Sequence, residues 1–414
     1  MPAAAYVHIP FCRRRCYYCD FPISVVGDRP PLSRLDNQSP REFGTIAEYV
    51  EALCQEILTF PAFAQPLDTV FLGGGTPSLL TVEQLTRILQ TLDTHIGIAA
   101  NAEISIEMDP GTFDLAVLQG YRAAGINRVS LGVQAFQPKL LAACGRSHTP
   151  ADIAAAVEMI RQVNLANFSL DLISGLPHQT LDHWQESLEA AIALHPTHLS
   201  VYDLTVEAGT AFDRWYQPGT NPLPSDATTA DMYRLAQKAL TQAGYEHYEI
   251  SNYARSGYQC RHNRVYWENR SYYGFGMGAT SYVNGQRFSR PRKRHDYYQW
   301  VQQLQEQQGL IDQPPASPED QLLDTLMLGL RLADGLKLEA IASQFTEAIL
   351  PDMLQCLQPY IQKGWVQLLT ENNQPFTWQD GAALPANSFL RLSDPEGFLF
   401  SNVILATLFE KLSA

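Results

Sequence analysis

The sequence predicts an α/β protein: an incomplete (β/α) barrel of six units, followed by a C-terminal α+β domain of winged-helix-like type. Over the first two hundred residues, six short apolar strands alternate with helical patterns. Near-continuous apolar strands separated by helices are typical of a parallel sheet that is covered on both faces. The last hundred residues instead place helices before two strands, which favours a separate α+β domain.

The six expected strands are apolar runs of five to seven residues. They span Ala5–Phe11, Asp68–Leu72, Glu103–Met108, Arg128–Gln134, Phe168–Ser174 and Leu199–Leu204. After the first strand, residues 22–44 are rich in Pro, Ser, Asp and Arg and are long enough to form a lid. A helix is expected to begin at Thr45, where Glu48 would complete a capping box.

Three domains are expected. Residues 1–215 would form the barrel, residues 216–312 an extension of it, and residues 313–414 the C-terminal domain. In the last segment, Ser317 and Pro318 are typical of a helix start. Further helices are expected near Leu338–Phe345, Leu350–Gln362 and Phe398–Leu408, with strands at Trp365–Leu369 and Phe389–Leu392.

Composition and charge narrow the classes of function. The chain has 45% hydrophobic and 17% charged residues, and its formal net charge is −14. Binding to nucleic acid or to an anionic membrane normally needs a basic surface, so neither partner is expected. No apolar run approaches the roughly 20 residues of a transmembrane helix. The N-terminus also lacks the pattern of an export signal, so we expect a cytoplasmic protein.

Three cysteines lie within eight residues, directly after the first strand. Cys12, Cys16 and Cys19 have the spacing C-x3-C-x2-C. A [4Fe–4S] cluster normally takes four thiolates, and the next cysteine, Cys54, falls on the apolar stripe of a predicted helix. One iron would therefore be free to bind a small molecule. A structural zinc site usually has four ligands, and seven cysteines in 414 residues do not suggest a disulfide framework.

Polar residues recur where the predicted strands end. Glu107, Gln134 and Asp171 belong to three consecutive strands, and Gly73-Gly74-Gly75-Thr76 follows an earlier one. In (β/α) barrels the chemistry lies at the C-terminal ends of the strands. A ligand with ribose hydroxyls and an α-amino acid end, such as S-adenosylmethionine (SAM), would satisfy these groups, and Arg146 could meet its carboxylate. A purely structural role in tight turns is the alternative.

Four motifs make the resemblance specific. Residues 6–12, 73–78, 132–136 and 171–177 resemble the radical SAM family of oxygen-independent coproporphyrinogen III oxidases and their relatives, over nearly the whole chain. This resemblance implies that Cys12, Cys16 and Cys19 hold a [4Fe–4S] cluster with SAM at its open iron. It also implies a SAM site lined by Tyr6, Gly74, Gly75, Thr76, Glu107, Gln134, Arg146 and Asp171.

Two features indicate which branch of the family the chain is similar to. The oxidases carry a fourth cysteine two positions after the third, where this chain has Phe21. They also carry a long extension before the tyrosine of the first motif, whereas five residues precede Tyr6 here. In both respects the chain is similar to the HemW-type haem chaperones, which share the fold and bind haem.

A second motif supports that branch. His262, Asn263, Tyr266 and Trp267 fit the H-N-x-x-Y-W pattern that is associated with haem binding in HemW-type proteins. A neutral imidazole is an ordinary axial ligand of haem iron, so the resemblance implies His262 as the ligand. Cys260 is a possible second, softer ligand. A histidine satisfied by ordinary packing remains the alternative.

We therefore expect a haem chaperone that binds haem and passes it to an acceptor protein whose identity the sequence does not indicate. An electron donor to the cluster would be a further partner. The first alternative is an oxygen-independent coproporphyrinogen III oxidase, an enzyme that decarboxylates two propionates. The second is a winged-helix regulator with the cluster as a redox sensor, which the negative charge disfavours.

Overall fold

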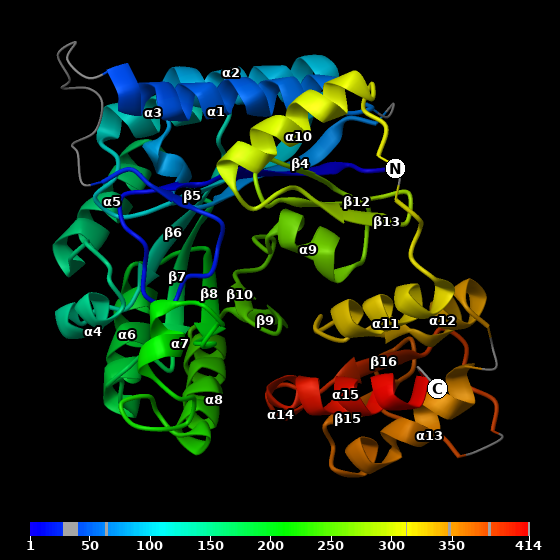
Figure 1. The fold of residues 1–414 in the computed structure, drawn as a ribbon. Helices are drawn as coiled ribbons and strands as arrows, with labels where there is room; N and C mark the ends of the chain where they lie inside the picture. Colours follow the sequence, from blue (N-terminus) through cyan, green and yellow to red (C-terminus); the bar gives the residue numbers. More distant parts are fainter. Residues whose placement is uncertain (28–39, 63–64, 312, 347–348, 380–381, 413–414) are drawn as a thin grey trace. The chain divides into compact units, whose positions relative to one another are not determined.

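The computed structural model describes residues 1–27, 40–62, 65–311, 313–346, 349–379 and 382–412 (Figure 1). They form two compact units. The first consists of Met1–Met232 and Ser271–Pro314, and the second of Tyr233–Arg270 and Pro315–Ala414. Residues 216–312, expected as one extension of the barrel, contribute to both units, and the division into three domains stays a prediction.

The first unit is a partial barrel of parallel strands, which confirms the predicted fold class. Within this unit the strand order is β11-β1-β4-β5-β6-β7-β8, and the neighbouring strands pair in parallel. The bounds are β1 Ala4–Ile9, β4 Leu67–Gly74, β5 Ile98–Met108, β6 Arg128–Gln134, β7 Phe168–Ser174, β8 His198–Asp203 and β11 Tyr273–Phe275. Strand β11 was not predicted, because its three residues acquire a strand conformation only by pairing with β1.

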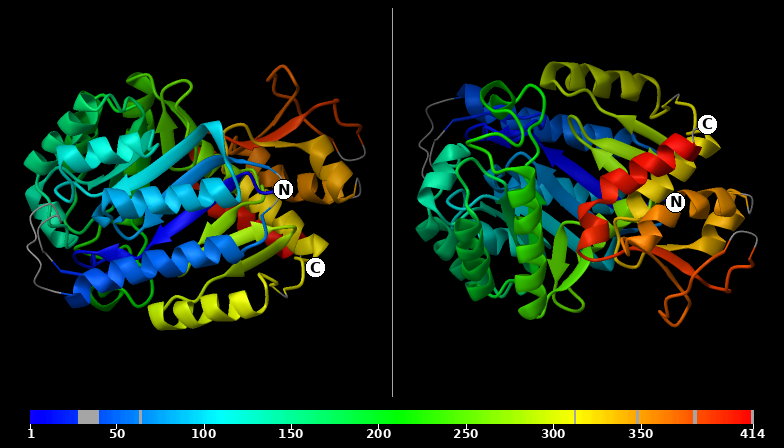
Figure 2. Two further views of the ribbon diagram at one scale, coloured as in Figure 1. Left: turned by 90° about the horizontal axis from the view of Figure 1, so that it is seen from above. Right: turned by 90° about the horizontal axis from the view of Figure 1, so that it is seen from below.

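Helices cover the outer face of this sheet. They are α1 Pro40–Thr59, α2 Val82–His95, α3 Leu115–Ala123, α5 Pro150–Gln162 and α6 Leu181–Ala193. Helix α10 (Arg294–Glu306) packs against α1, and the short helices α4 (Pro138–Ala143) and α7 (Ala211–Trp215) lie beside Tyr17 and Tyr18. Helix α1 packs beside α2 and α10, and Figure 2 shows α1 and α2 side by side over the strands. Capping boxes at Thr81, Thr149 and Thr180 begin α2, α5 and α6, because each threonine accepts a backbone N–H of the first turn.

Two expectations near the N-terminus were wrong. The first strand ends at Ile9, and β2 (Phe11–Cys12) pairs separately with β3 (Ser24–Val25). Pro10 lies at the break, since it has no N–H for a sheet hydrogen bond. Helix α1 begins at Pro40 rather than at Thr45. Of the expected lid over residues 22–44, residues 28–39 lie outside the described ranges.

The second unit contains the C-terminal α+β domain that was predicted. Strands β14 Leu336–Lys337, β16 Phe389–Leu392 and β15 Val366–Leu369 form an antiparallel sheet in that order. The accompanying helices are α11 Pro318–Gly329, α12 Leu338–Gln344, α13 Ile349–Gln362, α14 Glu396–Leu399 and α15 Ser401–Leu412. Leu326, Met353, Leu357, Leu390 and Leu408 are central to its apolar core.

The same unit holds the segment that carries the H-N-x-x-Y-W motif. It includes the C-terminal part of α8 (Asp226–Gln242), the antiparallel pair β9 (Glu246–Glu249) and β10 (Asn252–Ala254), and α9 (Arg261–Trp267). Among the helices of the described ranges, none is long and apolar enough to cross a membrane.

Candidate functional site

The three cysteines lie on a loop that folds back on itself after β2. The N–H of Val26 donates to the carbonyl oxygen of Cys12 at 2.9 Å, which brings the end of the loop beside its start. The Arg15 guanidinium donates to the carbonyl oxygens of Cys19 at 3.1 Å and Phe21 at 3.2 Å. All three cysteines are half-buried free thiols. The loop therefore holds them in one compact segment without a disulfide.

The chemistry of these thiols fits an iron–sulfur cluster. Burial raises the pKa of Cys12 to about 12, and the nearby Cys19 and Cys16 raise it further, while a hydrogen bond with the Thr76 side chain opposes the rise. Burial also raises the pKa of Cys19. Such thiols ionise when a bound metal compensates the charge. Within the described ranges, no three His, Cys, Asp or Glu residues converge as on a single metal ion. An iron–sulfur cluster does not need its thiolates to converge on one ion, because each thiolate binds a different iron.

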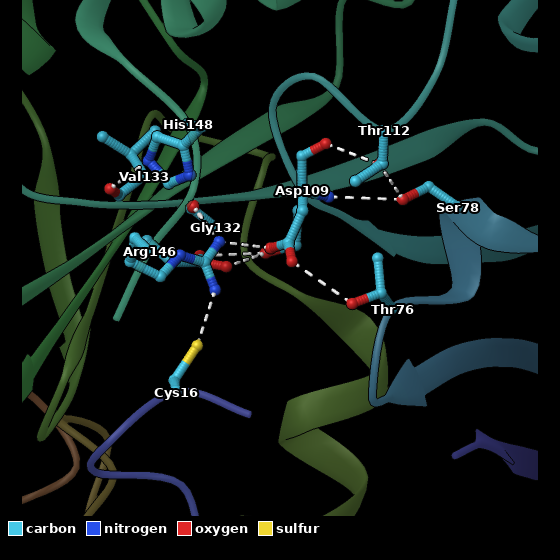
Figure 3. A network of polar contacts seen from close by, with 11 residues as sticks. Cys16, Thr76, Ser78, Asp109, Thr112, Gly132, Val133, Arg146 and His148 are labelled. Atoms are coloured by element: carbon cyan, nitrogen blue, oxygen red, sulfur yellow. Dashed lines mark hydrogen bonds and ion pairs between the residues drawn. The ribbon is translucent and has the colours of Figure 1, made fainter. Parts of the chain in front are cut away.

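Arg146 joins the cysteine loop to the end of the sheet (Figure 3). Its Nη1 lies 3.5 Å from Sγ of Cys16, and its Nη2 donates to the carbonyl oxygen of Gly132 at 2.8 Å. The same Nη2 forms an ion pair with Asp109, and the Arg146 side chain is only 8% exposed. Arg146, predicted to bind a ligand carboxylate, is thus already paired with a carboxylate of the protein.

Asp109 is the main site residue that the sequence analysis missed. Its Oδ2 accepts a hydrogen bond from the Thr76 hydroxyl at 3.2 Å. Its backbone N–H and C=O bond to Ser78 at 3.3 Å and Thr112 at 2.7 Å, and these contacts fix its orientation (Figure 3). Asp109 follows Glu107 by two positions and comes directly after β5. Its position just past a strand end was the available signal.

Gly132 explains why these side chains fit together. A Cβ atom at Gly132 would lie 2.9 Å from Asp109 Oδ1, 3.1 Å from Gln134 Nε2 and 3.2 Å from Arg146 Nη2. The missing side chain therefore leaves the room in which those three groups meet. Gln134 itself has a φ of 67° at the end of β6, where the register with β7 shifts. Left-handed backbone in a non-glycine residue is often found at functional sites.

The glycine run packs against the protein's own backbone. A Cβ at Gly75 would lie 2.7 Å from the carbonyl oxygen of Phe11, and one at Gly74 would lie 2.4 Å from the His8 ring. The N–H of Gly75 donates to the carbonyl oxygen of Ile9 at 2.9 Å. The N–H of Gly74 donates to Oε2 of Glu107 at 2.9 Å. These two N–H groups therefore bond within the protein rather than pointing outward toward a ligand.

Glu107 and Tyr6 form a neighbouring polar group. Burial raises the pKa of Glu107 to about 8, and the charges of Asp171 and Asp109 act in the same direction. Burial, with the charge of Glu107, raises the pKa of Tyr6 well above its usual value. The Tyr6 hydroxyl is hydrogen-bonded to Nδ1 of His8 at 3.0 Å. Both groups are therefore mostly neutral near pH 7.

Asp171 was expected at the end of its strand, and this expectation was wrong. It is the fourth residue of β7 and pairs in register with Gly132 on one side and Ser200 on the other. Its oxygens accept hydrogen bonds from Ser130 at 2.8 Å and Ser169 at 3.2 Å. Burial raises its pKa, and the hydrogen bonds from the serines act against the rise.

His262 belongs to the second unit, on the short helix α9. It is 1% exposed, and its Nε2 is hydrogen-bonded to the Tyr266 hydroxyl at 2.8 Å. Burial lowers its pKa to about 3, so the ring is neutral near pH 7. Cys260 precedes α9, is buried, and donates its N–H to the Tyr248 hydroxyl at 3.2 Å.

Comparisons with known proteins show which families the chain is similar to. The sequence matches the Radical SAM superfamily over residues 6–191 and the HemN C-terminal domain over residues 316–374. A Synechocystis protein named Heme chaperone HemW is 50% identical over 412 residues, covering 100% of this chain and 97% of the relative. A Bacillus subtilis protein of the same name is 34% identical over 366 residues, covering 88% and 92%.

Among solved structures, the coproporphyrinogen III oxidase HemN from Escherichia coli, described as a radical SAM enzyme, has a similar fold. Its TM-score is 0.78 at 25% sequence identity, and the match covers 98% of this chain and 90% of that one.

Proposed function

The chain belongs to the HemW family, and from this premise we propose that it is a haem chaperone that binds haem and passes it to an acceptor protein. The observation that carries the proposal is the 50% identity, over the whole chain, with a protein named Heme chaperone HemW. Phe21, which stands where the oxidases have a fourth cysteine, supports the same branch.

We propose further that Cys12, Cys16 and Cys19 hold a [4Fe–4S] cluster and that SAM binds beside it. A cluster held by three thiolates would leave one iron open to the amino and carboxylate groups of SAM. The reduced cluster would also supply an electron. The Glu107 carboxyl would accept a hydrogen bond from the SAM ammonium group. Arg146, held by Asp109, would attract the SAM carboxylate.

The remaining residues implied by the resemblance would complete the pocket. Gln134 and Asp171 offer amide and carboxylate groups to the ribose hydroxyls. Gly74, Gly75 and Thr76 hold β4 close to β1 and β2, as the hydrogen bonds of Gly75 and Thr76 to the carbonyl oxygens of Ile9 and Phe11 indicate. In this proposal the glycines position the pocket wall, and the carboxylates recognise the ligand.

For haem, we propose His262 as the axial ligand. A neutral imidazole is the form that binds metal, and burial keeps His262 neutral at physiological pH. If Nε2 is the ligand atom, the Tyr266 hydroxyl must first release it. Tyr266 therefore competes with the haem iron for this nitrogen, and haem binding includes the breaking of that hydrogen bond.

Haem titrations of paired variants test this assignment. His262→Ala should weaken haem binding and shift the Soret band. Tyr266→Phe keeps the ring and removes only the competing hydroxyl, so it should bind haem about fivefold more tightly, for ~1 kcal/mol of lost hydrogen bond. Cys260→Ser is the control and should keep a histidine-like spectrum. Unchanged binding in His262→Ala would exclude this ligand.

A counter-assay addresses the oxidase alternative, because HemN shares the fold. The anaerobically reconstituted protein should bind haem and load an apo haem protein, and should leave coproporphyrinogen III unconverted. Protoporphyrinogen formed over many turnovers would show that the oxidase assignment is right and that the chaperone assignment is wrong.

A further inference from the structure

Residues Ser271–Pro314, here named the returning segment, belong to the first unit although the residues just before them belong to the second. The returning segment contributes β11, which pairs with β1, and α10, which packs against α1 (Figure 1). It lies outside both matches to family models, which cover residues 6–191 and 316–374. Neither match therefore accounts for what this segment does.

The returning segment contacts the cysteine loop directly after the third cysteine. Nη2 of Arg292 donates to the backbone oxygen of Asp20 at 2.7 Å. A Cβ atom at Gly278, whose φ is 74°, would lie 2.3 Å from Cγ of Pro22. That distance is shorter than any ordinary Cβ contact, so the close packing of this turn on Pro22 requires glycine. Two residues of the loop that follow Cys19 are thus held by the returning segment.

His8 of β1 holds the same part of the loop from another direction in the sequence. Its Nε2 lies 3.0 Å from the carbonyl oxygen of Pro22, and its Nδ1 lies 3.0 Å from the Tyr6 hydroxyl. Because a carbonyl oxygen can only accept, Nε2 carries the proton and Nδ1 accepts the hydrogen bond from Tyr6. The His8 ring therefore connects the cysteine loop to Tyr6, the neighbour of Glu107.

Tyr49 of α1 joins His8 to the returning segment. Its hydroxyl donates to the backbone oxygen of His8 at 2.7 Å and accepts the N–H of Met277 at 2.9 Å. The Tyr49 side chain is fully buried. A Cβ atom at Gly276 would lie 2.5 Å from the Tyr49 hydroxyl oxygen, so the backbone approaches this hydroxyl closely. One buried hydroxyl thus holds two separate backbone segments together.

We propose that Tyr49 is a positioning residue of the cluster site, and that with Gly278 and Arg292 it braces the end of the cysteine loop in the geometry that receives the cluster. The inference rests on the proposed function, since it assumes a cluster in the cysteine loop. The three bracing residues act on the cluster through His8 and the backbone of the loop, without binding it. The returning segment is then part of the cluster site.

A purely structural role of Tyr49 predicts a different pattern of effects. Tyr121 has an equally buried hydroxyl, which donates to the backbone oxygen of Leu80 at 2.6 Å. If Tyr49 only stabilised the fold, Tyr49→Phe and Tyr121→Phe would act alike on the cysteines. If Tyr49 positions the loop, only Tyr49→Phe should change the accessibility of the loop thiols.

Alkylation of the cluster-free protein by N-ethylmaleimide tests the proposal, with each cysteine followed by mass spectrometry. Tyr49→Phe should raise the alkylation rate of Cys19 about five- to tenfold, the factor expected when the net effect of about one neutral hydrogen bond no longer opposes opening of the loop. Tyr121→Phe should change this rate by less than about twofold, because local opening depends on local contacts. Cys356 of the second unit is the internal reference and should react at the same rate in all samples.

A glycine variant reaches the loop without altering Tyr49. Gly278→Ala places a methyl group against Pro22 and should also raise the alkylation rate of Cys19. Its control is Gly257→Ala, because Gly257 has a similar φ of 82° but a Cβ atom there would have no neighbour within 4 Å. The control imposes the same backbone strain without the contact, and the rate for Cys19 should stay unchanged.

Arg292→Gln removes the hydrogen bond to Asp20 in the same way. The Arg292 side chain is 63% exposed, so this variant should fold like the wild type. Lys293→Gln is its control, because it removes the adjacent exposed charge and leaves the bond to Asp20 in place. Only Arg292→Gln should raise the alkylation rate of Cys19.

The reconstituted protein supplies a second measurement, which a merely structural role would not change. The EPR spectrum of the reduced cluster should shift in Tyr49→Phe and keep its wild-type line positions in Tyr121→Phe. An iron chelator such as bathophenanthroline should remove iron from Tyr49→Phe about five- to tenfold faster than from the wild type, for the same loss of bracing.

Wild-type alkylation rates in Tyr49→Phe, Gly278→Ala and Arg292→Gln would overturn the proposal. An equal rise in Tyr49→Phe and Tyr121→Phe would do the same, because it would reduce Tyr49 to a role in stability. If Tyr49→Phe does not fold, Arg292→Gln decides by the same measurement. Failure of the wild type to assemble a cluster would count against the proposed function, whereas alkylation of the cluster-free protein would still test the bracing of the loop.

Discussion

Arg146 lies between a cysteine of the proposed cluster and a carboxylate of the sheet: its Nη1 is 3.5 Å from Cys16 Sγ, while its Nη2 pairs with Asp109. One largely buried cation thus contacts both the cysteine loop and the end of β5. A ligand carboxylate that binds here must share this guanidinium with Asp109. The pairing keeps Arg146 oriented before any ligand arrives.

The role of Arg146 can be tested by SAM binding. Arg146→Gln should raise the SAM dissociation constant by about tenfold to over a hundredfold, because the ligand carboxylate loses a charged partner worth ~1.5–3 kcal/mol. Equilibrium dialysis measures the change. His148→Gln is the matched control, since His148 instead bonds the carbonyl oxygen of Val133 at 3.0 Å and should leave SAM affinity nearly unchanged. Equal losses in both variants would contradict a specific role.

Because the pKa of Glu107 is raised, we expect the affinity for SAM to depend on pH. Its pKa is raised to about 8, so at pH 6 the carboxyl is protonated, and a SAM ammonium must displace that proton. SAM affinity should therefore rise as the pH increases toward 8, by at most about tenfold per pH unit for one linked proton, and then level off. Glu107→Gln should flatten this profile and weaken binding at pH 8. A wild-type profile that is flat from pH 6 to 8 would argue against contact between Glu107 and the ammonium.

The assignment of the cluster to Cys12, Cys16 and Cys19 predicts which Cys→Ser variants of the protein lose iron. After anaerobic reconstitution, Cys12→Ser, Cys16→Ser and Cys19→Ser should each lose most iron and sulfide, because a cluster already short of one thiolate would keep only two. Cys54→Ser and Cys144→Ser are controls, since both cysteines are buried. Cys144 is the more stringent control because it lies against the cysteine loop: its carbonyl oxygen accepts a hydrogen bond from the N–H of Tyr17 at 3.0 Å. An iron-deficient Cys144→Ser protein would point to a fourth ligand.

Helix α1 contributes one glutamate to a fully buried ion pair and another to an exposed ion pair. We expect loss of the buried pair to reduce the free energy of unfolding far more than loss of the exposed pair. Glu56 of α1 bonds Arg290 at 2.7 Å with both side chains fully buried, and it also accepts hydrogen bonds from Tyr297 at 2.6 Å and the Gly276 N–H at 2.8 Å. Arg290→Ala should lower the free energy of unfolding by ~3–5 kcal/mol, because Glu56 is left unpaired.

The control for this prediction is Arg87→Ala. Arg87 of α2 pairs with Glu51 of α1, the helix that also carries Glu56, but the side chains of Arg87 and Glu51 are both about half exposed. Removal of such a pair should change stability by ~0–1 kcal/mol. Urea unfolding measures both variants. Similar midpoints for Arg290→Ala and the wild type would show that the buried pair contributes little.

Much of the fold could be predicted because its signals are local. The bounds of β6, β7 and β16 agree with the apolar runs in the sequence. The spacing of Cys12, Cys16 and Cys19 is likewise visible in eight residues. Strand β11 could not be predicted, since only its pairing with β1 makes those three residues a strand. The start of α1 at Pro40 was also missed, because Thr45 and Glu48 imitate a helix start within the helix.

Within the candidate site, the sequence by itself determined the residue types: three closely spaced thiols, a glycine run after one strand, and acidic or amide groups on the next three. Only the tertiary structure decided how they are used. It paired Arg146 with Asp109, turned the N–H groups of Gly74 and Gly75 toward the protein, and closed His262 against Tyr266. The physical reason is that periodicity and spacing act within one element, whereas hydrogen bonds and ion pairs join residues whose distance is set by the packing of the whole chain.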